Sequence, residues 1–264
     1  MTFSVVAFDP KREEWGVAVA SKYLSVGSVV PWALHGTGCV ATQAMANYSY
    51  GPRGLELLRN MNADEAIENL ISSDPDREHR QVGLVDSKGN AAAHTGSKCM
   101  NFAGQLIGKN FSVQGNILAG REVLDAMYSE MIKGYPLEER LINCLMAGEK
   151  AGGDRRGKQS AAMLITSSKR EFEPGSQKFI EIRVEDHVDP VNELARIRDI
   201  WMLMFADSDT VEVSDYSSLI EKKLKSLNYQ TLEEWAGINN LEHNLKDGRI
   251  GKRTLSLLLG MGES

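Results

Sequence analysis

The order of the expected strands and helices is the feature that most constrains the fold of this chain. Two apolar strand-like segments, 4–9 and 15–21, open it and are joined by a turn that contains Pro10. The remaining elements are expected as follows: a strand at 37–43, a helix at 52–61, a helix with a capping box at Asn62 and Glu65, strands at 81–86, 91–94 and 111–118, helices at 120–133 and 136–150, strands at 159–166 and 178–184, and a long helix opened by Asp189 and Pro190. Because strands follow strands and helices follow helices, a doubly wound parallel sheet is disfavoured. We expect an α+β fold with antiparallel, hairpin-built sheets and helices on their outer faces.

Length and a change in composition indicate how the chain is divided. Its 264 residues suffice for one domain of about 200 residues and an appendage. The polar stretch 207–215 is typical of a domain boundary, and the leucines beyond it suit helices. We therefore predict one domain at residues 1–206 and a small helical C-terminal extension at residues 207–264.

Composition also narrows the classes of function. A formal net charge of −6 argues against a nucleic-acid partner, which usually binds a basic face. No stretch approaches the ~18–20 apolar residues of a membrane span, and the start lacks a signal peptide, so we expect a cytoplasmic protein with no membrane partner. Three scattered cysteines (Cys39, Cys99 and Cys144) fit a reducing compartment. The histidines are isolated, so we predict neither a metal site nor a cofactor.

The start of the chain carries the clearest candidate chemistry. Thr2 lies at the tip of the first strand, and removal of Met1 would leave its hydroxyl beside its own free α-amine. In the N-terminal threonine variant of nucleophilic catalysis, that amine takes the hydroxyl proton. Its reference pKa of about 7.7–8.0 suits a base near neutral pH. Ser4 is the competing hydroxyl, although its amine becomes free only if three residues are removed.

Polar residues at the ends of other strands are candidates for substrate contacts. Gln43 and Asn47 leave a strand-like run, where their amides either bind an oxyanion or an amide in a cleft, or cap a turn. Asn116, which follows Gly115, has the same character. The sequence leaves both interpretations open.

The glycine-rich segment 152–160 nearly matches a phosphate-binding pattern. Gln159 replaces the hydroxyl residue that the pattern requires, and the expected order of helix, loop and strand is the reverse of a P-loop, so we reject nucleotide binding. We predict instead that Asp154 and Arg156 form an ion pair that braces the loop. The alternative is that Arg156 clamps a substrate carboxylate.

Several segments together resemble a known family, the domain of unknown function 1028 family. They span about residues 2–205 and read TFSVVAFDP, GVAVASKYLSVGSVVPW, VATQAMANYSYGPRGL, RQVGLVD, QGNILAG, AGGDRRGKQSAAMLI and RVEDHVDPV. The family is similar to the N-terminal nucleophile (Ntn) hydrolases. The resemblance therefore implies a four-layer αββα sandwich with antiparallel sheets. It also implies an enzyme that cleaves amide bonds with the first residue of the mature chain.

The resemblance also implies roles for individual residues. Thr2 takes the nucleophile position, with Ser4 as the competing assignment, and Ser21 is the polar residue beside the nucleophile. The acidic residue and strand lysine of proteasome-type sites are not recognisable at matching positions. The segment LNYQTLEEWAGINNLE in the tail is similar to an extension in some members that has been likened to a peptidoglycan-binding module.

Three hypotheses follow for the function. The first is an Ntn-type amidohydrolase that acts on a small amide or peptide-like substrate, needs no cofactor and forms a homo-oligomer. Substrate contacts would come from Gln43, Asn47 or Asn116, and Arg156 would orient a carboxylate. The second is a non-catalytic scaffold that binds a ligand or partners. The third is a hydrolase that uses Cys39 or Ser160 with a nearby histidine.

Overall fold

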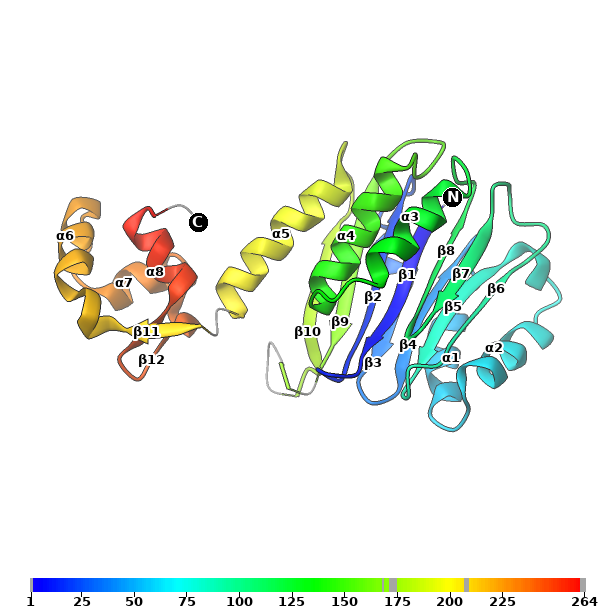
Figure 1. Cartoon of the computed structure of the whole chain (residues 1–264), viewed down its shortest axis with the longest axis horizontal. Coiled ribbons are helices and arrows are strands. Elements are labelled where there is room, and N and C mark those ends of the chain that lie inside the picture. Colours follow the sequence, from blue (N-terminus) through cyan, green and yellow to red (C-terminus); the bar gives the residue numbers. More distant parts are fainter. Residues whose placement is uncertain (1, 168, 171–174, 207–208, 262–264) are drawn as a thin grey trace. The chain divides into compact units, whose positions relative to one another are not determined.

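The computed structural model describes residues 2–167, 169–170, 175–206 and 209–261 (Figure 1). It divides into two compact units, residues 1–195 and 196–264. The division falls inside α5 (Pro190–Phe205), upstream of the polar stretch in which the sequence suggests a boundary.

Two antiparallel sheets form the first unit, as the hairpin pattern predicts. The six-stranded sheet has the order β10 (Lys178–Val184), β9 (Ser160–Thr166), β2 (Glu14–Ser21), β1 (Thr2–Asp9), β8 (Phe111–Asn116) and β7 (Gly104–Gly108). The four-stranded sheet has the order β3 (Pro31–Leu34), β4 (Gly38–Gln43), β5 (Gln81–Asp86) and β6 (Ala91–Thr95). Every pair of neighbouring strands is antiparallel. The α+β class with antiparallel sheets is therefore confirmed.

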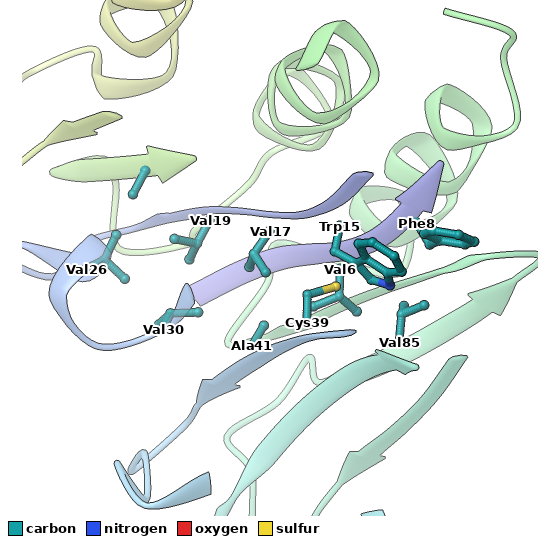
Figure 2. Packing of buried hydrophobic residues seen from close by; sticks show 11 residues of the cluster. Val6, Phe8, Trp15, Val17, Val19, Val26, Val30, Cys39, Ala41 and Val85 are labelled. Atoms are coloured by element: carbon teal, nitrogen blue, oxygen red, sulfur yellow. The ribbon is translucent and has the colours of Figure 1, made fainter. Parts of the chain in front are cut away.

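An apolar core lies between the two sheets, and alternation along β1 and β2 creates it. Successive side chains of a strand point to opposite faces, so Val6 and Phe8 share one face with Val17 and Val19 of the paired strand. These residues pack against Cys39, Ala41 and Val85 of the other sheet (Figure 2). The same alternation directs the even-numbered positions of β1, which include Thr2 and Ser4, toward the second sheet.

Helices cover the opposite face of each sheet. Both α3 (Glu122–Met131) and α4 (Leu137–Lys150) pack on the six-stranded sheet, where Gly16 allows close approach because a Cβ there would lie 2.7 Å from Leu141 Cδ1. The helices α1 (Tyr50–Leu58) and α2 (Ala63–Ser72) pack on the four-stranded sheet through a second apolar cluster (Figure 1). The capping box predicted at Asn62 and Glu65 is present at the start of α2.

The second unit is not purely helical, which corrects the prediction of a helical extension. Its helices α6 (Ser217–Leu227), α7 (Leu232–Ile238) and α8 (Lys252–Leu259) surround a core that includes Leu224, Trp235 and Leu258. A three-stranded sheet of β11 (Thr210–Glu212), β13 (Arg249–Gly251) and β12 (Leu245–Lys246) lies beside them. These strands have two or three residues, too few to produce a recognisable alternation. Within the residues that the structure describes, no helix has the length and apolar character needed to cross a membrane.

Candidate functional site

The paired ends of β1 and β2 bring two hydroxyls together. Phe3 pairs with Ala20, so Thr2 and Ser21 lie opposite each other one position further along. Thr2 Oγ1 and Ser21 Oγ share a hydrogen bond of 3.1 Å, and both residues are buried, with 7% and 2% of their surface exposed. Met1, whose removal the N-terminal chemistry requires, lies outside the described residues. The two hydroxyls singled out in the sequence are therefore neighbours in the fold.

Thr2 lines a pocket of about 420 Å³. One wall is aliphatic and comes from Val26, Val29 and Val30, which follow β2. The other described residues that line it are Tyr23, Gln43, Ala44, Met45, Ala46, Tyr48 and Arg80. This volume lies in the lower part of the range of about 300–1,000 Å³ that is typical of small-molecule sites. The arrangement fits a small ligand held against the threonine hydroxyl.

The loop that follows β4 shapes the pocket through an unusual backbone. Ala44 and Met45 both have a positive φ, of 57° and 46°, although neither is glycine. Such conformations cost about 1–3 kcal/mol each and persist only where surrounding contacts enforce them. Here the Thr42 hydroxyl donates to the Asn47 carbonyl, and the Arg80 guanidinium donates to the Met45 carbonyl. The loop is thus held in a fixed shape above the pocket.

Asn47 stabilises this loop and does not line the pocket. Its Nδ2 donates to Asp74 Oδ2 at 3.0 Å, and its Oδ1 accepts from the Ser49 backbone N–H and hydroxyl at 3.1 and 2.8 Å. Of the two interpretations that the sequence left open, these contacts match the capping of a turn.

Asp74 is a buried carboxylate that accepts hydrogen bonds from several residues in and beside this loop. Burial alone would raise the pKa of this carboxyl, but hydrogen bonds from Asn47, the Asp76 backbone, Tyr50 and Arg80 outweigh it and hold the pKa well below its usual range. Asp74 is therefore ionised at neutral pH and fixes the Arg80 side chain through a contact of 3.1 Å.

Behind the pocket, three buried amide side chains join the two sheets. Gln43 Nε2 donates to Gln81 Oε1 at 2.8 Å, and Asn116 Nδ2 donates to the same oxygen at 2.9 Å. Gln81 Nε2 in turn donates to Thr95 Oγ1 and to the carbonyls of Gly104 and Gly115. Asn116 pairs with Thr2 across β1 and β8 but does not line the pocket. The network connects the backbone around Thr2 to the second sheet.

Gln43 adjoins the pocket with its donor already engaged. Besides Gln81, its Nε2 group faces the carbonyl oxygens of Thr2 and Gln114 at 3.4 and 3.5 Å. Its Oε1 is buried and has no hydrogen-bond partner among the described residues. Gln43 therefore has little capacity to donate to an oxyanion, and its free capacity is as an acceptor.

Ser4 belongs to a closed network between the sheets. Gln114 Nε2 donates to its Oγ at 2.7 Å, and the Ser112 hydroxyl donates to Gln114 Oε1 at 2.9 Å. The absence of a side chain at Gly83 makes room for Gln114, since a Cβ there would lie 2.3 Å from Gln114 Oε1. Ser4 is fully buried and is not among the residues that line the pocket.

Asp154 and Arg156 lie outside the pocket that Thr2 lines. Their carboxylate and guanidinium are 3.4 Å apart, which confirms the predicted ion pair. Asp154 also accepts hydrogen bonds from the backbone N–H groups of Lys22 and Arg156, at 2.7 and 2.8 Å, and so ties the loop to the end of β2. Asp154 and Ser21 both line a separate cavity of about 140 Å³. These contacts favour a bracing role for the pair.

Within the described residues, no hydrogen bond joins Cys39 or Ser160, the alternative nucleophiles, to a histidine. Burial raises the pKa of the Cys39 thiol to about 12, and its Sγ donates to the Ala7 carbonyl. The Ser160 hydroxyl donates to the Tyr23 carbonyl and accepts from the Val26 N–H. Across the described ranges, no group of three or more acidic, histidine or cysteine side chains is arranged to hold a metal ion.

Sequence reasoning missed Arg80, Tyr48 and Gln81 as residues of this region. Arg80 directly precedes β5 and Gln81 is its first residue, and nothing in the local pattern distinguishes them from ordinary surface and core residues. The one available signal in the sequence is that polar residues lie at the ends of β4, β5 and β8. Antiparallel pairing places Gln43 opposite Gln81, and Asn116 of the other sheet bonds to Gln81.

Comparison with known proteins identifies the family. Residues 2–194 match the model of a family of unknown function, DUF1028, and the chain belongs to this family. The chain is similar to protein SPO2555 from Silicibacter pomeroyi, a DUF1028 protein of known crystal structure, with 31% identity, a TM-score of 0.71 and coverage of 78% of this chain and 88% of that chain. It has a distant likeness to Anbu (ancestral beta-subunit) from Yersinia bercovieri, with 13% identity, a TM-score of 0.34 and coverage of 76% and 93%. No curated protein matches the chain.

Proposed function

We propose that this protein is an Ntn-type amidohydrolase with Thr2 as its nucleophile, and that its facing sheets and outer helices form the four-layer αββα sandwich of that class. The observation that carries the proposal is the position of Thr2, which lines a small-molecule pocket while its hydroxyl bonds to Ser21. The resemblance of this family to Ntn hydrolases supports the same assignment. The substrate is a small amide or a peptide-like molecule, and the reaction needs no cofactor.

The proposed reaction proceeds in two steps. After removal of Met1, Thr2 Oγ1 attacks the amide carbonyl carbon, its proton passes to the α-amine, and the leaving nitrogen takes that proton as the C–N bond breaks. Water then attacks the resulting ester, which releases the acid and restores the hydroxyl. Ser21 acts as a positioning residue, because its hydroxyl fixes the rotamer of the Thr2 side chain through the 3.1 Å hydrogen bond.

The amide residues have supporting roles in this proposal. Gln43 steadies the Thr2 backbone through its Nε2 group and offers Oε1 as an acceptor to a donor in the pocket. Asn47 and Asn116 act through the loop and the buried network that they hold, and Asp154 and Arg156 brace the end of β2. Ser4 maintains the packing between the sheets and takes no part in the reaction.

A non-catalytic ligand-binding scaffold is the second candidate, and one observation favours it. Among the described residues that line the pocket there is no lysine and no carboxylate, whereas a proteasome-type site uses both beside the nucleophile. The scaffold hypothesis predicts ligand binding without turnover and without dependence on the Thr2 hydroxyl.

A comparison of variants at Thr2 separates the two candidates. Wild-type protein, Thr2→Ser and Thr2→Ala would be incubated with a panel of small amides, and release of amine would be measured. The hydrolase predicts turnover by wild type, retained activity in Thr2→Ser and none in Thr2→Ala. Ser4→Ala serves as the matched control, and we expect it to keep kcat. Equal turnover by wild type and Thr2→Ala would refute the proposal.

A further inference from the structure

Arg80 brings a fixed positive charge to the pocket that contains Thr2. It stands directly before β5, and its side chain is mostly buried, with 16% exposed. Nε donates to Asp74 at 3.1 Å, one Nη group donates to the Met45 carbonyl, and the other faces Asp76 at 3.5 Å. These contacts hold the plane of the guanidinium before any ligand arrives, which reduces the entropy lost on binding.

The guanidinium keeps capacity for a ligand. Arginine carries five N–H groups in a planar fork, and three of them are directed at the acceptors above. The other two have no acceptor among the described residues. Because Arg80 lines the pocket, these donors are available to a group bound there. A planar fork of this kind matches the geometry of a carboxylate.

The rest of the lining defines the sign and polarity of the ligand. Within the described part of the pocket, Arg80 has the one charged side chain, and the Asp74 carboxylate that fixes it is turned to Arg80, Asn47 and Tyr50. The wall of Val26, Val29 and Val30 is aliphatic, and Tyr23 and Tyr48 at the pocket are about half exposed. The pocket therefore combines one cationic side chain with an apolar surface and the threonine hydroxyl.

We propose that the substrates are small amides that carry both a free carboxylate and an apolar group, such as N-acyl amino acids with an aliphatic side chain. This inference rests on the proposed function, since it concerns the same pocket. The carboxylate binds Arg80, the aliphatic group packs against the valine wall, and the amide carbonyl lies at Thr2. Hydrolysis adds one water across the C–N bond and gives a carboxylic acid and an amino acid, whose carboxylate is the group held by Arg80.

A purely structural role for Arg80 makes a different prediction. If the guanidinium only ties the Met45 loop to Asp74, its loss disturbs the pocket for every ligand alike. If it recognises a carboxylate, its loss reduces binding of the carboxylate ligand selectively. The ratio of two affinities in the same variant therefore distinguishes the roles.

The test measures binding in the Thr2→Ala background, which has no nucleophile, so that its outcome is independent of turnover. The probes are N-acetyl-L-leucine and N-acetyl-L-leucinamide, which differ in the carboxylate alone, titrated by NMR or calorimetry at low ionic strength. We expect N-acetyl-L-leucine, the carboxylate, to bind at least about ten-fold more tightly than N-acetyl-L-leucinamide, the carboxamide. Arg80→Gln should bring this ratio close to one, Arg80→Lys should keep part of it, and Arg77→Gln, a change at an exposed arginine that does not line the pocket, should leave it unaltered.

Two results would overturn the inference. One is equal affinity for the two probes in the Thr2→Ala protein, which decides the matter even where Arg80→Gln does not fold. The other is an equal loss of both affinities in Arg80→Gln. Failure of the hydrolase proposal would appear elsewhere, as a lack of amine release by wild-type protein, and would leave the measured affinity ratio intact.

Discussion

Glu14 should make the stability of the first unit strongly dependent on pH, and replacing it should remove that dependence. Glu14 is buried in β2 at the end remote from Thr2. Its Oε1 contacts Arg170 at 3.1 Å, while its Oε2 has no hydrogen-bond partner among the described residues. Burial raises the pKa of this carboxyl from 4.5 to about 7, against the opposing effect of Arg170. Glu138, which shares Arg170, raises the pKa further.

The raised pKa determines the sign of the effect. Between pH 4.5 and 7 the folded state binds the Glu14 proton more tightly than the unfolded state, so the contribution to stability is largest at low pH and falls as the pH rises through this window. One pKa unit corresponds to about 1.36 kcal/mol. The difference between 4.5 and about 7 therefore corresponds to about 3 kcal/mol of lost stability at pH 8 relative to pH 4.

Glu14→Gln removes the titrating group and keeps its shape. The stability of the variant minus that of wild type should rise by about 2–3 kcal/mol from pH 4.5 to pH 8. The assay is urea unfolding followed by fluorescence, in a Trp201→Phe and Trp235→Phe background so that the remaining tryptophans report on the first unit. Glu13→Gln, at an exposed neighbouring position, is the matched control. A difference between Glu14→Gln and wild type that stays constant across this pH range would refute the reasoning.

Two further substitutions test the site and its support. Ser21→Ala removes the hydrogen bond to Thr2 Oγ1, worth about 1 kcal/mol, and should lower kcat about five-fold. Ser129→Ala, on the surface of α3, is the control and should leave kcat unchanged. An unchanged kcat in Ser21→Ala would contradict the positioning role. Gly83→Ala forces a Cβ against the immobile Gln114 amide and should lower the free energy of unfolding by about 1–3 kcal/mol. Gly134→Ala, where a Cβ meets nothing within 4 Å, is its control, and equal stability of the two variants in urea unfolding would count against the packing argument.

Local patterns predicted much of the fold because the relevant forces act over short stretches of sequence. The hairpin of β1 and β2 follows from two apolar runs around a turn, and the start of α2 follows from its capping box. Strands β3 and β7 were missed. Both are edge strands whose residues are mostly half-buried. The short apolar strand β3 opens with a proline, which disfavours a strand prediction, and β7 has only two apolar side chains, Leu106 and Ile107, between its terminal glycines.

The site was predictable only in part, for a similar reason. Thr2, Ser21 and Gln43 end strands that the sequence identifies, so their proximity follows from strand pairing and sheet stacking. Arg80 was not predictable in this way. It contacts the loop at Ala44 and Met45, where both residues have a positive φ that alanine and methionine do not predict. The catalytic roles, the homo-oligomer and the cytoplasmic location stay predictions.

The most direct test of the central claim is the mass of the intact protein before and after treatment with a β-lactone, an electrophile that acylates N-terminal nucleophiles. We predict a chain that lacks Met1, a single acyl adduct that maps to Thr2, and no adduct on Thr2→Ala. A purified protein that retains Met1, or one that lacks Met1 and acquires no adduct at Thr2, would contradict the account.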